Sequence, residues 1–129
     1  MLREMLRAKV HRATVTETNV AYEGSLTLDK SLMDAAGLIP YERVDVYNAD
    51  NGSRFSTYLI TGRAGSGVVC VNGAAAHLAR PGHRIIIAAY AALGPEEIAG
   101  HRPTVVLVDA ANRVREIHRE IFAGTEVPA

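Results

Sequence analysis

Gly24 and Ser25 share a peptide bond whose two residue types could react with each other. They lie in the stretch Tyr-Glu-Gly-Ser, after a polar run and before Leu-Thr-Leu-Asp, which has the pattern of a strand. The Ser25 hydroxyl can attack the Gly24 carbonyl if the backbone is held strained and donors stabilise the oxyanion, and Gly crowds a carbonyl least. The alternative is a plain turn, because Gly tolerates positive φ and Ser bonds to its own backbone.

Attack by Ser25 would change the chain covalently. An N-to-O acyl shift gives an ester, and β-elimination from that ester cuts the chain and leaves dehydroalanine, whose enamine hydrolyses to a ketone. Ser25 then becomes an N-terminal pyruvoyl group. This carbonyl forms a Schiff base with an amine substrate and accepts electrons as a carboxylate leaves as carbon dioxide, the role of pyridoxal phosphate elsewhere. The predicted cofactor is therefore made from the chain itself, without pyridoxal phosphate.

Other kinds of functional site have less support in the sequence. The five histidines show neither His-Glu-x-x-His nor paired cysteine spacing, so we expect no metal site. The glycines of Gly65-Ser-Gly precede a strand, whereas a dinucleotide loop needs them after one. Cys70 and His77 are a conceivable nucleophile and base, but a thiol in the apolar run Val-Val-Cys-Val is expected to be core packing with a pKa raised by burial.

Composition bounds the class of protein. The chain has 129 residues, 48% hydrophobic and 22% charged, with 14 acidic and 14 basic side chains. This predicts a single domain over residues 1–129 and gives no footprint for nucleic acid. The sequence has no apolar segment of membrane-spanning length, its first residues do not resemble a signal peptide, and a lone cysteine suits a reducing compartment. We therefore expect a cytoplasmic protein that binds no membrane.

The elements that must position these residues are mostly strands. A short helix over 31–36 is expected between an Asp29 N-cap and a Gly37 stop, Asp50-Asn-Gly predicts a hairpin, and residues 72–77 predict one helical turn. Six or seven short strands favour a mainly β, closed barrel, since closure removes exposed edges. Alternating or β-branched segments place these strands at residues 5–16, 26–28, 44–47, 55–60, 68–71, 85–90 and 104–109.

Five separated motifs resemble those of the bacterial aspartate 1-decarboxylases, in register from residue 1 to about residue 109. They are Lys9-Val-His-Arg-Ala-Thr-Val-Thr, Tyr22-Glu-Gly-Ser, Asp34-Ala-Ala-Gly, Asn51-Gly-Ser-Arg-Phe-Ser-Thr-Tyr and Val71-Asn-Gly-Ala-Ala-Ala-His. The resemblance implies a small six-stranded double-psi β-barrel with short helical connectors. It also implies a homotetramer with active sites between neighbouring subunits.

The same resemblance implies an activity. The chain would be made as a zymogen and cut itself between Gly24 and Ser25 into residues 1–24 (the β chain) and 25–129 (the α chain). The mature lyase would convert L-aspartate to β-alanine and carbon dioxide, and the β-alanine would supply pantothenate biosynthesis.

Cationic residues match the family's substrate-binding positions. Arg54 corresponds to the residue that holds a substrate carboxylate, a task suited to a planar guanidinium. Lys9 and His11 alternate with apolar neighbours, so they could face one side of a strand and form a second cationic wall for a dianionic substrate. Without the resemblance, Arg54 would be a solvated charge, and Lys9 with His11 a polar strand face.

The remaining matched positions surround the cleavage site. Thr57 corresponds to the hydroxyl that polarises the Gly24 carbonyl during processing and contacts substrate, and Tyr58 to the phenol that returns a proton after decarboxylation. Neighbours on one strand point to opposite faces, so Thr57 and Tyr58 require a bend or act in different steps. The other pocket and substrate positions are Tyr22, Asn72, Gly73, Ala74 and Ala75, with Tyr47, Ile60 and Ile86 as an apolar wall.

Some of the chain departs from the family or allows other functions. Position 47 is Tyr where relatives often have Trp, and nothing after Ala110 aligns well enough to carry a function. One alternative is a binding module that recognises an acidic metabolite through Arg54 and Lys9 and keeps its chain intact. Another is a cysteine hydrolase that uses Cys70 and does not need Ser25.

Overall fold

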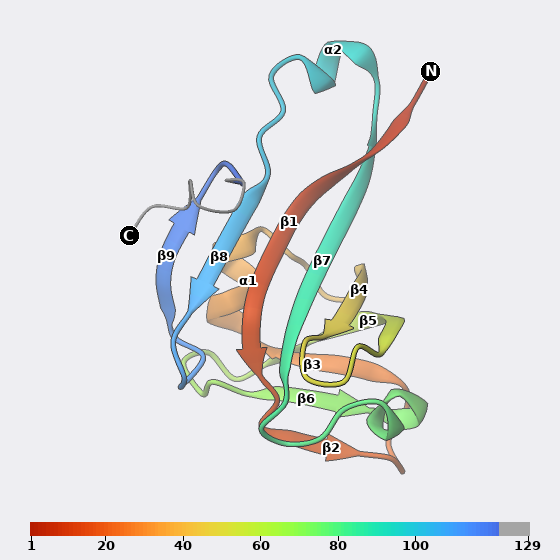
Figure 1. Ribbon diagram of the computed structural model, residues 1–129, viewed down its shortest axis with the longest axis vertical. Helices are drawn as coiled ribbons and strands as arrows, with labels where there is room; N and C mark the ends of the chain where they lie inside the picture. The colour runs from red at the N-terminus through yellow and green to blue at the C-terminus, as the bar shows by residue number, and fades with distance from the viewer. Residues whose placement is uncertain (122–129) are drawn as a thin grey trace.

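The computed structural model describes residues 1–121, which form a mainly β structure (Figure 1). Nine strands make one mixed sheet in the order β2-β6-β3-β5-β4-β7-β1-β8-β9. Two short α-helices, α1 (Lys30–Ala36) and α2 (Pro95–Ile98), and the 3-10 helix η1 (Gly73–His77) connect them. The strands are β1 (Arg3–Thr14), β2 (Glu17–Asn19), β3 (Ser25–Asp29), β4 (Arg43–Asn48), β5 (Arg54–Gly62), β6 (Val69–Asn72), β7 (Arg84–Leu93), β8 (Thr104–Val108) and β9 (Val114–His118).

The predicted mainly β class, the β4–β5 hairpin and the helical turn after Asn72 are confirmed. Seven of the nine strands were predicted from the sequence, whereas β2 and β9 were not expected. β2 spans three polar residues, Glu-Thr-Asn, and β9, Val-Arg-Glu-Ile-His, has four exposed residues out of five. Neither carries the apolar alternation by which a half-buried strand is recognised in a sequence.

The sheet changes direction as it passes from one end of its order to the other. In Figure 1, β1, β7, β8 and β9 follow the long axis of the molecule, whereas β2, β3 and β6 run across it at the base. Both groups contribute side chains to one core, in which Val10 of β1, Leu26 of β3 and Ile87 of β7 are fully buried. β3 therefore begins, at the buried Ser25, within a packed sheet.

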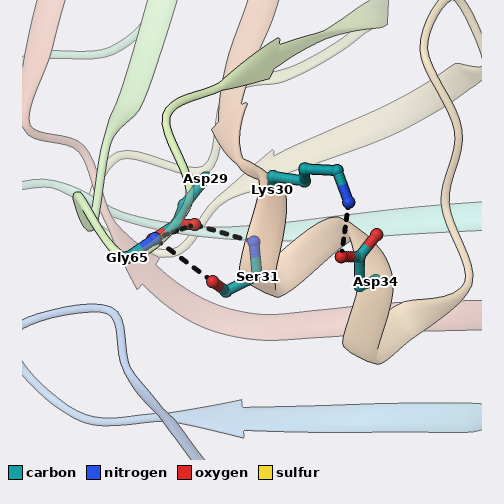
Figure 2. A network of polar contacts seen from close by, with 5 residues as sticks. All are labelled: Asp29, Lys30, Ser31, Asp34 and Gly65. Carbon is teal, nitrogen blue, oxygen red and sulfur yellow. Dashed lines mark hydrogen bonds and ion pairs between the residues drawn. The ribbon is translucent and has the colours of Figure 1, made fainter.

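Asp29 joins the end of β3 to the start of α1, as the sequence predicted (Figure 2). Its carboxylate accepts hydrogen bonds from the backbone N–H groups of Ser31, Gly65 and Gly67, at 2.7, 2.9 and 2.8 Å. Burial alone would raise the pKa of Asp29, but these hydrogen bonds outweigh it and lower the pKa below its ordinary value. The helix ends at Gly37, whose φ of 70° is left-handed.

Neither helix within residues 1–121 has the length and apolar content needed to cross a membrane.

Candidate functional site

Four polar side chains gather on one face of the β3–β6 pair. The antiparallel register places Ser25 opposite Asn72 and Thr27 opposite Cys70. Because side chains alternate along a strand, the residues between them, Leu26 on β3 and Val71 on β6, point to the other face and are fully buried in the core. This polar face therefore rests on a rigid apolar layer.

Hydrogen bonds connect all four side chains of this polar face. Asn72 Nδ2 donates to Ser25 Oγ at 2.9 Å and to Thr27 Oγ1 at 3.0 Å, and Cys70 Sγ donates to Asn72 Oδ1 at 3.1 Å. Ser25 Oγ in turn donates to the carbonyl oxygen of Glu23 at 3.3 Å. Ser25 is fully buried and Asn72 is 3% exposed. A buried hydroxyl with a fixed amide donor is suited to a reaction in which its oxygen takes on negative charge.

The turn after Asn72 packs directly against the Gly24-Ser25 segment. Gly73, at the start of η1, has a φ of 71°, and a Cβ added there would lie 2.6 Å from Gly24 Cα and 3.2 Å from the carbonyl oxygen of Tyr22. Any other residue at position 73 would therefore force the two backbones apart. Ala74 and Ala75 continue this turn with small side chains.

Strand β5 brings Tyr58 to the level of Ser25. It pairs with β4 through residues 54–58 and in parallel with β3 from Leu59 onward, where Leu59 lies beside Leu26 and Ile60 beside Thr27. Alternation along β5 then places Tyr58 and Ile60 on the face that carries Thr27 and Ser25, and Thr57 on the opposite face, opposite Val44 of β4. Tyr58 and Thr57 are half-buried, and within residues 1–121 neither side chain hydrogen-bonds to Ser25.

Arg54 lies at the other end of β5, in a small aromatic cluster. Its guanidinium carbon lies 4.4 Å from the centroid of the Tyr47 ring, and the Tyr47 hydroxyl shares a 2.9 Å hydrogen bond with the Tyr90 hydroxyl. That hydrogen bond, with burial second, raises the pKa of Tyr47 to about 12. Ile86 pairs with Tyr47 across the β4–β7 ladder. Arg54 is exposed, so its donors are accessible to a carboxylate.

Lys9 and His11 face one side of β1, as the alternation predicted, while Ala8 and Val10 between and beside them are buried. Both line a cavity of about 660 Å³, together with Arg12, Thr14, Arg84, Val105, Leu107, Val108, Asp109, Ala110, Arg115, Glu116, His118, Glu120 and Ile121. In the described part of the chain, His11 Nδ1 is the one buried side-chain nitrogen or oxygen without a hydrogen-bond partner. Burial, followed by the charges of Lys9 and Arg12, lowers the pKa of His11.

The two polar regions do not meet within one chain. Three strands, β5, β4 and β7, separate β3 from β1 in the sheet order. The cavity at Lys9 and His11 has neither Ser25 nor Asn72 in its lining. The structure thus brings Ser25, Asn72, Gly73 and Gly24 together, with Tyr22 and Tyr58 nearby, and keeps Lys9 and His11 apart from them. Residues 1–121 contain no group of three or more His, Cys, Asp or Glu side chains placed to hold a metal ion.

A family model described as Aspartate decarboxylase matches residues 1–115. The chain belongs to the aspartate decarboxylase family. It is 55% identical over 117 residues to the Aspartate 1-decarboxylase of Neisseria meningitidis serogroup C, covering 91% of this chain and 92% of that relative. It is 58% identical over 113 residues to the Aspartate 1-decarboxylase of Syntrophobacter fumaroxidans, covering 88% and 91%. The same comparison gives 52% over 118 residues for the enzyme of Legionella pneumophila, covering 92% and 89%.

This result confirms the family resemblance seen in the sequence motifs. Aspartate decarboxylases are pyruvoyl-dependent lyases of the pantothenate pathway. The matched region ends six residues before the end of the described part of the chain and includes only the first two residues of β9, Val114 and Arg115.

Sequence reasoning missed three members of these clusters. Cys70 is buried as expected, but it donates a hydrogen bond to Asn72 in addition to packing. Thr27 and Tyr90 were not singled out, although each hydrogen-bonds to a predicted site residue. The available signal was the alternation of Ser25-x-Thr27 and Cys70-x-Asn72, which places each pair on one face of its strand.

Proposed function

We propose that this chain cuts itself between Gly24 and Ser25, and that the pyruvoyl group formed from Ser25 serves in the decarboxylation of L-aspartate to β-alanine and carbon dioxide. Family membership supplies the reaction. The observation that carries the proposed self-cleavage is the 2.9 Å hydrogen bond from Asn72 Nδ2 to a completely buried Ser25 Oγ.

The cleavage begins with attack of Ser25 Oγ on the Gly24 carbonyl carbon. An oxygen–carbon bond forms, the carbon–nitrogen bond breaks, and the hydroxyl proton moves to the released amine. Loss of the Ser25 Cα proton then breaks the Cβ–Oγ bond, so residues 1–24 leave with a carboxylate and residues 25–129 begin with dehydroalanine. Water then hydrolyses the enamine of this dehydroalanine, so that a ketone oxygen replaces the nitrogen and the nitrogen leaves as ammonia. Asn72 assists the elimination, because its NH2 group donates to the Oγ atom that becomes an oxygen of the departing carboxylate.

The residues around Ser25 fit a small electrophilic carbonyl group. The Asn72 amide supplies a donor at Ser25. Because Gly73 has no side chain, the backbone of the turn formed by Gly73, Ala74 and Ala75 can lie close to Gly24 and Ser25. Once formed, the pyruvoyl carbonyl supplies an electrophile for the substrate amine and a sink for the electrons that the departing carboxylate leaves behind.

Two aromatic or hydroxyl residues of β5 are assigned to different steps. Tyr58 lies on the face that carries Ser25, which supports the proposal that its phenol returns a proton to the substrate carbon after carbon dioxide leaves. From the family resemblance we assign Thr57 to the Gly24 carbonyl during processing and to substrate contact afterwards, although its side chain lies on the other face of β5. Tyr22, whose carbonyl approaches Gly73, lines the same site.

Substrate binding requires cations that one chain does not bring to Ser25. Arg54 offers paired donors for a carboxylate, and Lys9 offers a second cation on β1, beside His11, whose lowered pKa keeps its imidazole mostly neutral. Since β1 is three strands away from β3, we propose a homotetramer in which Lys9 and His11 of one copy face Ser25 of another.

Mixed assemblies test this sharing of sites. At aspartate concentrations below the wild-type KM, chains carrying Ser25→Ala and chains carrying Lys9→Ala are each expected to be poorly active alone, and their co-expression should restore a fraction of wild-type turnover. Restoration occurs because some sites combine an intact Ser25 with an intact Lys9 from different copies. If co-expression gives no more activity than the sum of the two variants, the site is not shared.

The remaining structural proposals follow the family resemblance. We propose that the sheet is a six-stranded double-psi β-barrel core to which the other strands are added, and that residues 1–129 are one domain that stays assembled after cleavage. Its parallel β1–β8, β2–β6 and β3–β5 pairs, mixed with antiparallel ladders around one core, support this topology. The single free cysteine suits a cytoplasmic enzyme.

A carbonyl reagent tests the proposed cofactor. Phenylhydrazine should inactivate the mature enzyme and add to the chain that begins at position 25, and aspartate should protect against it. Ser25→Ala protein should fold, remain a single chain and take up no reagent, because alanine has no hydroxyl with which to cut the chain. Retained activity of Ser25→Ala, or of fully labelled wild-type enzyme, would contradict the proposal.

A further inference from the structure

The orientation of the Asn72 amide is decided by its neighbours. An amide side chain presents a donor group at one end and an acceptor oxygen at the other, and rotation by half a turn exchanges them. As oriented, Nδ2 donates to both Ser25 Oγ and Thr27 Oγ1, while Oδ1 accepts from Cys70 Sγ. The reverse orientation would turn Oδ1 toward Ser25.

The hydroxyls of Ser25 and Thr27 do not favour either orientation of the Asn72 amide, because each hydroxyl can donate or accept. The Cys70 thiol favours the observed orientation, since it donates to Oδ1 and is only a poor acceptor. Burial, with Glu17 second, raises the pKa of Cys70, so the thiol keeps its proton at neutral pH. Cys70 is 7% exposed, which leaves little solvent to replace its hydrogen bond.

We propose that Cys70 and Thr27 are positioning residues for self-cleavage, which hold the Asn72 amide with its NH2 group toward Ser25 Oγ. The inference rests on the proposed cleavage at Gly24-Ser25. In that reaction, Oγ gains negative charge as the Cβ–Oγ bond breaks and Oγ leaves as an oxygen of the Gly24 carboxylate. An N–H donor stabilises this charge, whereas an amide oxygen turned toward it would repel it.

Four variants of residues 70, 27 and 71 test this assignment. Each chain is made in a cell-free system, and its cleavage is followed by intact mass over time. Cys70→Ala removes the donor and should slow cleavage about tenfold, the effect of one buried hydrogen bond. Cys70→Ser restores a donor and should cleave within about twofold of wild type. Thr27→Val keeps the shape but removes one acceptor for Nδ2, and a slowing of about threefold is expected.

Val71→Ala is the matched control for packing. Val71 lies between Cys70 and Asn72 on β6, is fully buried and points away from the amide. Its truncation should lower the melting temperature more than Cys70→Ala does, yet leave the cleavage rate near that of wild type. A merely structural role for Cys70 would instead make the cleavage rate follow the melting temperature across all four variants.

The possible failures are distinguishable. Wild-type cleavage rates in Cys70→Ala, or equally slow cleavage in Cys70→Ser and Cys70→Ala, would overturn the positioning role and leave self-cleavage intact. A wild-type chain that never cleaves would overturn both proposals. Turnover by the fully cleaved fraction of Cys70→Ala provides a second readout, and it should stay closer to wild type than the cleavage rate does, because the effect falls on chain scission.

Discussion

The polar face at Ser25 and the cationic cavity at Lys9 differ in how their hydrogen bonds are used. At the first, Ser25, Thr27, Cys70 and Asn72 hydrogen-bond to one another; Thr27 is half-buried and the other three are almost closed to solvent. At the second, His11 Nδ1 is buried without a partner and lines a cavity of about 660 Å³.

A closed network and an open one suit different reaction partners. A buried donor set whose hydrogen bonds are made within the chain is suited to a reaction of the chain itself, and the peptide bond before Ser25 lies next to it. A cationic side chain that lines a cavity, such as Lys9, can bind a molecule from outside. The comparison assigns self-cleavage to the β3–β6 face and recognition of a dianionic substrate to β1, so variants in the two regions should affect different measurements.

Asn72→Ala should have the largest effect, on the closed region. It removes the donor to Ser25 Oγ, and we expect self-cleavage to slow about a hundredfold, as for loss of an oxyanion donor. Intact mass against time measures this rate. Asn51→Ala is the control, since Asn51 is an exposed loop amide that bonds to the Leu78 carbonyl. Equal cleavage rates in the two variants would remove Asn72 from the mechanism.

Lys9→Ala should act on the open region alone. Loss of one cation that faces a substrate carboxylate is expected to raise the KM for aspartate about tenfold while cleavage proceeds at the wild-type rate. Lys30→Ala provides the control, because Lys30 is an exposed cation already paired with Asp34 at 2.8 Å. A slowed cleavage with unchanged KM would reverse the assignment of the two regions.

The pH dependence of stability sharpens the comparison further. The folded chain lowers the pKa of His11 from its ordinary 6.5, so the unfolded chain binds a proton there more readily. Stability should therefore fall as the pH drops through that range. Between about pH 8 and about pH 5, the melting temperature of His11→Gln should fall by a few degrees less than that of the wild-type chain. If the melting temperature of His11→Gln fell as much in acid as that of wild type, the pKa of His11 would not be lowered in the folded chain.

Tyr90→Phe is expected to give the smallest effect. It removes the hydroxyl that bonds to Tyr47, whose ring lies under the Arg54 guanidinium. A less fixed guanidinium should raise the KM for aspartate about twofold to threefold without altering cleavage. Phe55→Leu, which changes an apolar neighbour of Arg54 on β5, is the control for general loosening of the strand. An unchanged KM in Tyr90→Phe would mean that Arg54 needs no support from Tyr47.

The sequence predicted the local elements better than their spatial relations. The α1 caps at Asp29 and Gly37, the hairpin before Arg54 and the alternation of Lys9 with His11 depend on neighbouring residues, and all appear in the structure. The three-strand separation between Lys9 and Ser25 depends on long-range pairing, which no local pattern specifies.

The polar face at Ser25 was only partly predictable for a related reason. Asn72 was found by family resemblance, whereas Cys70 and Thr27 belong to the site because β3 and β6 pair in one register. A shift of that register by one residue would turn both away from Asn72. An isolated Val-Val-Cys-Val run therefore predicts packing, and the hydrogen bond from its thiol becomes visible only once the partner strand is placed.

The most direct test of this account is the mass of the newly made wild-type chain as it ages. We predict that the full-length species gives way to two fragments, residues 1–24 and residues 25–129, and that decarboxylase activity rises in proportion. The larger fragment should resist Edman degradation and be lighter by one ammonia than a fragment that begins with serine. A fully active preparation that consists of one uncut chain, with an unmodified serine at position 25, would contradict the account.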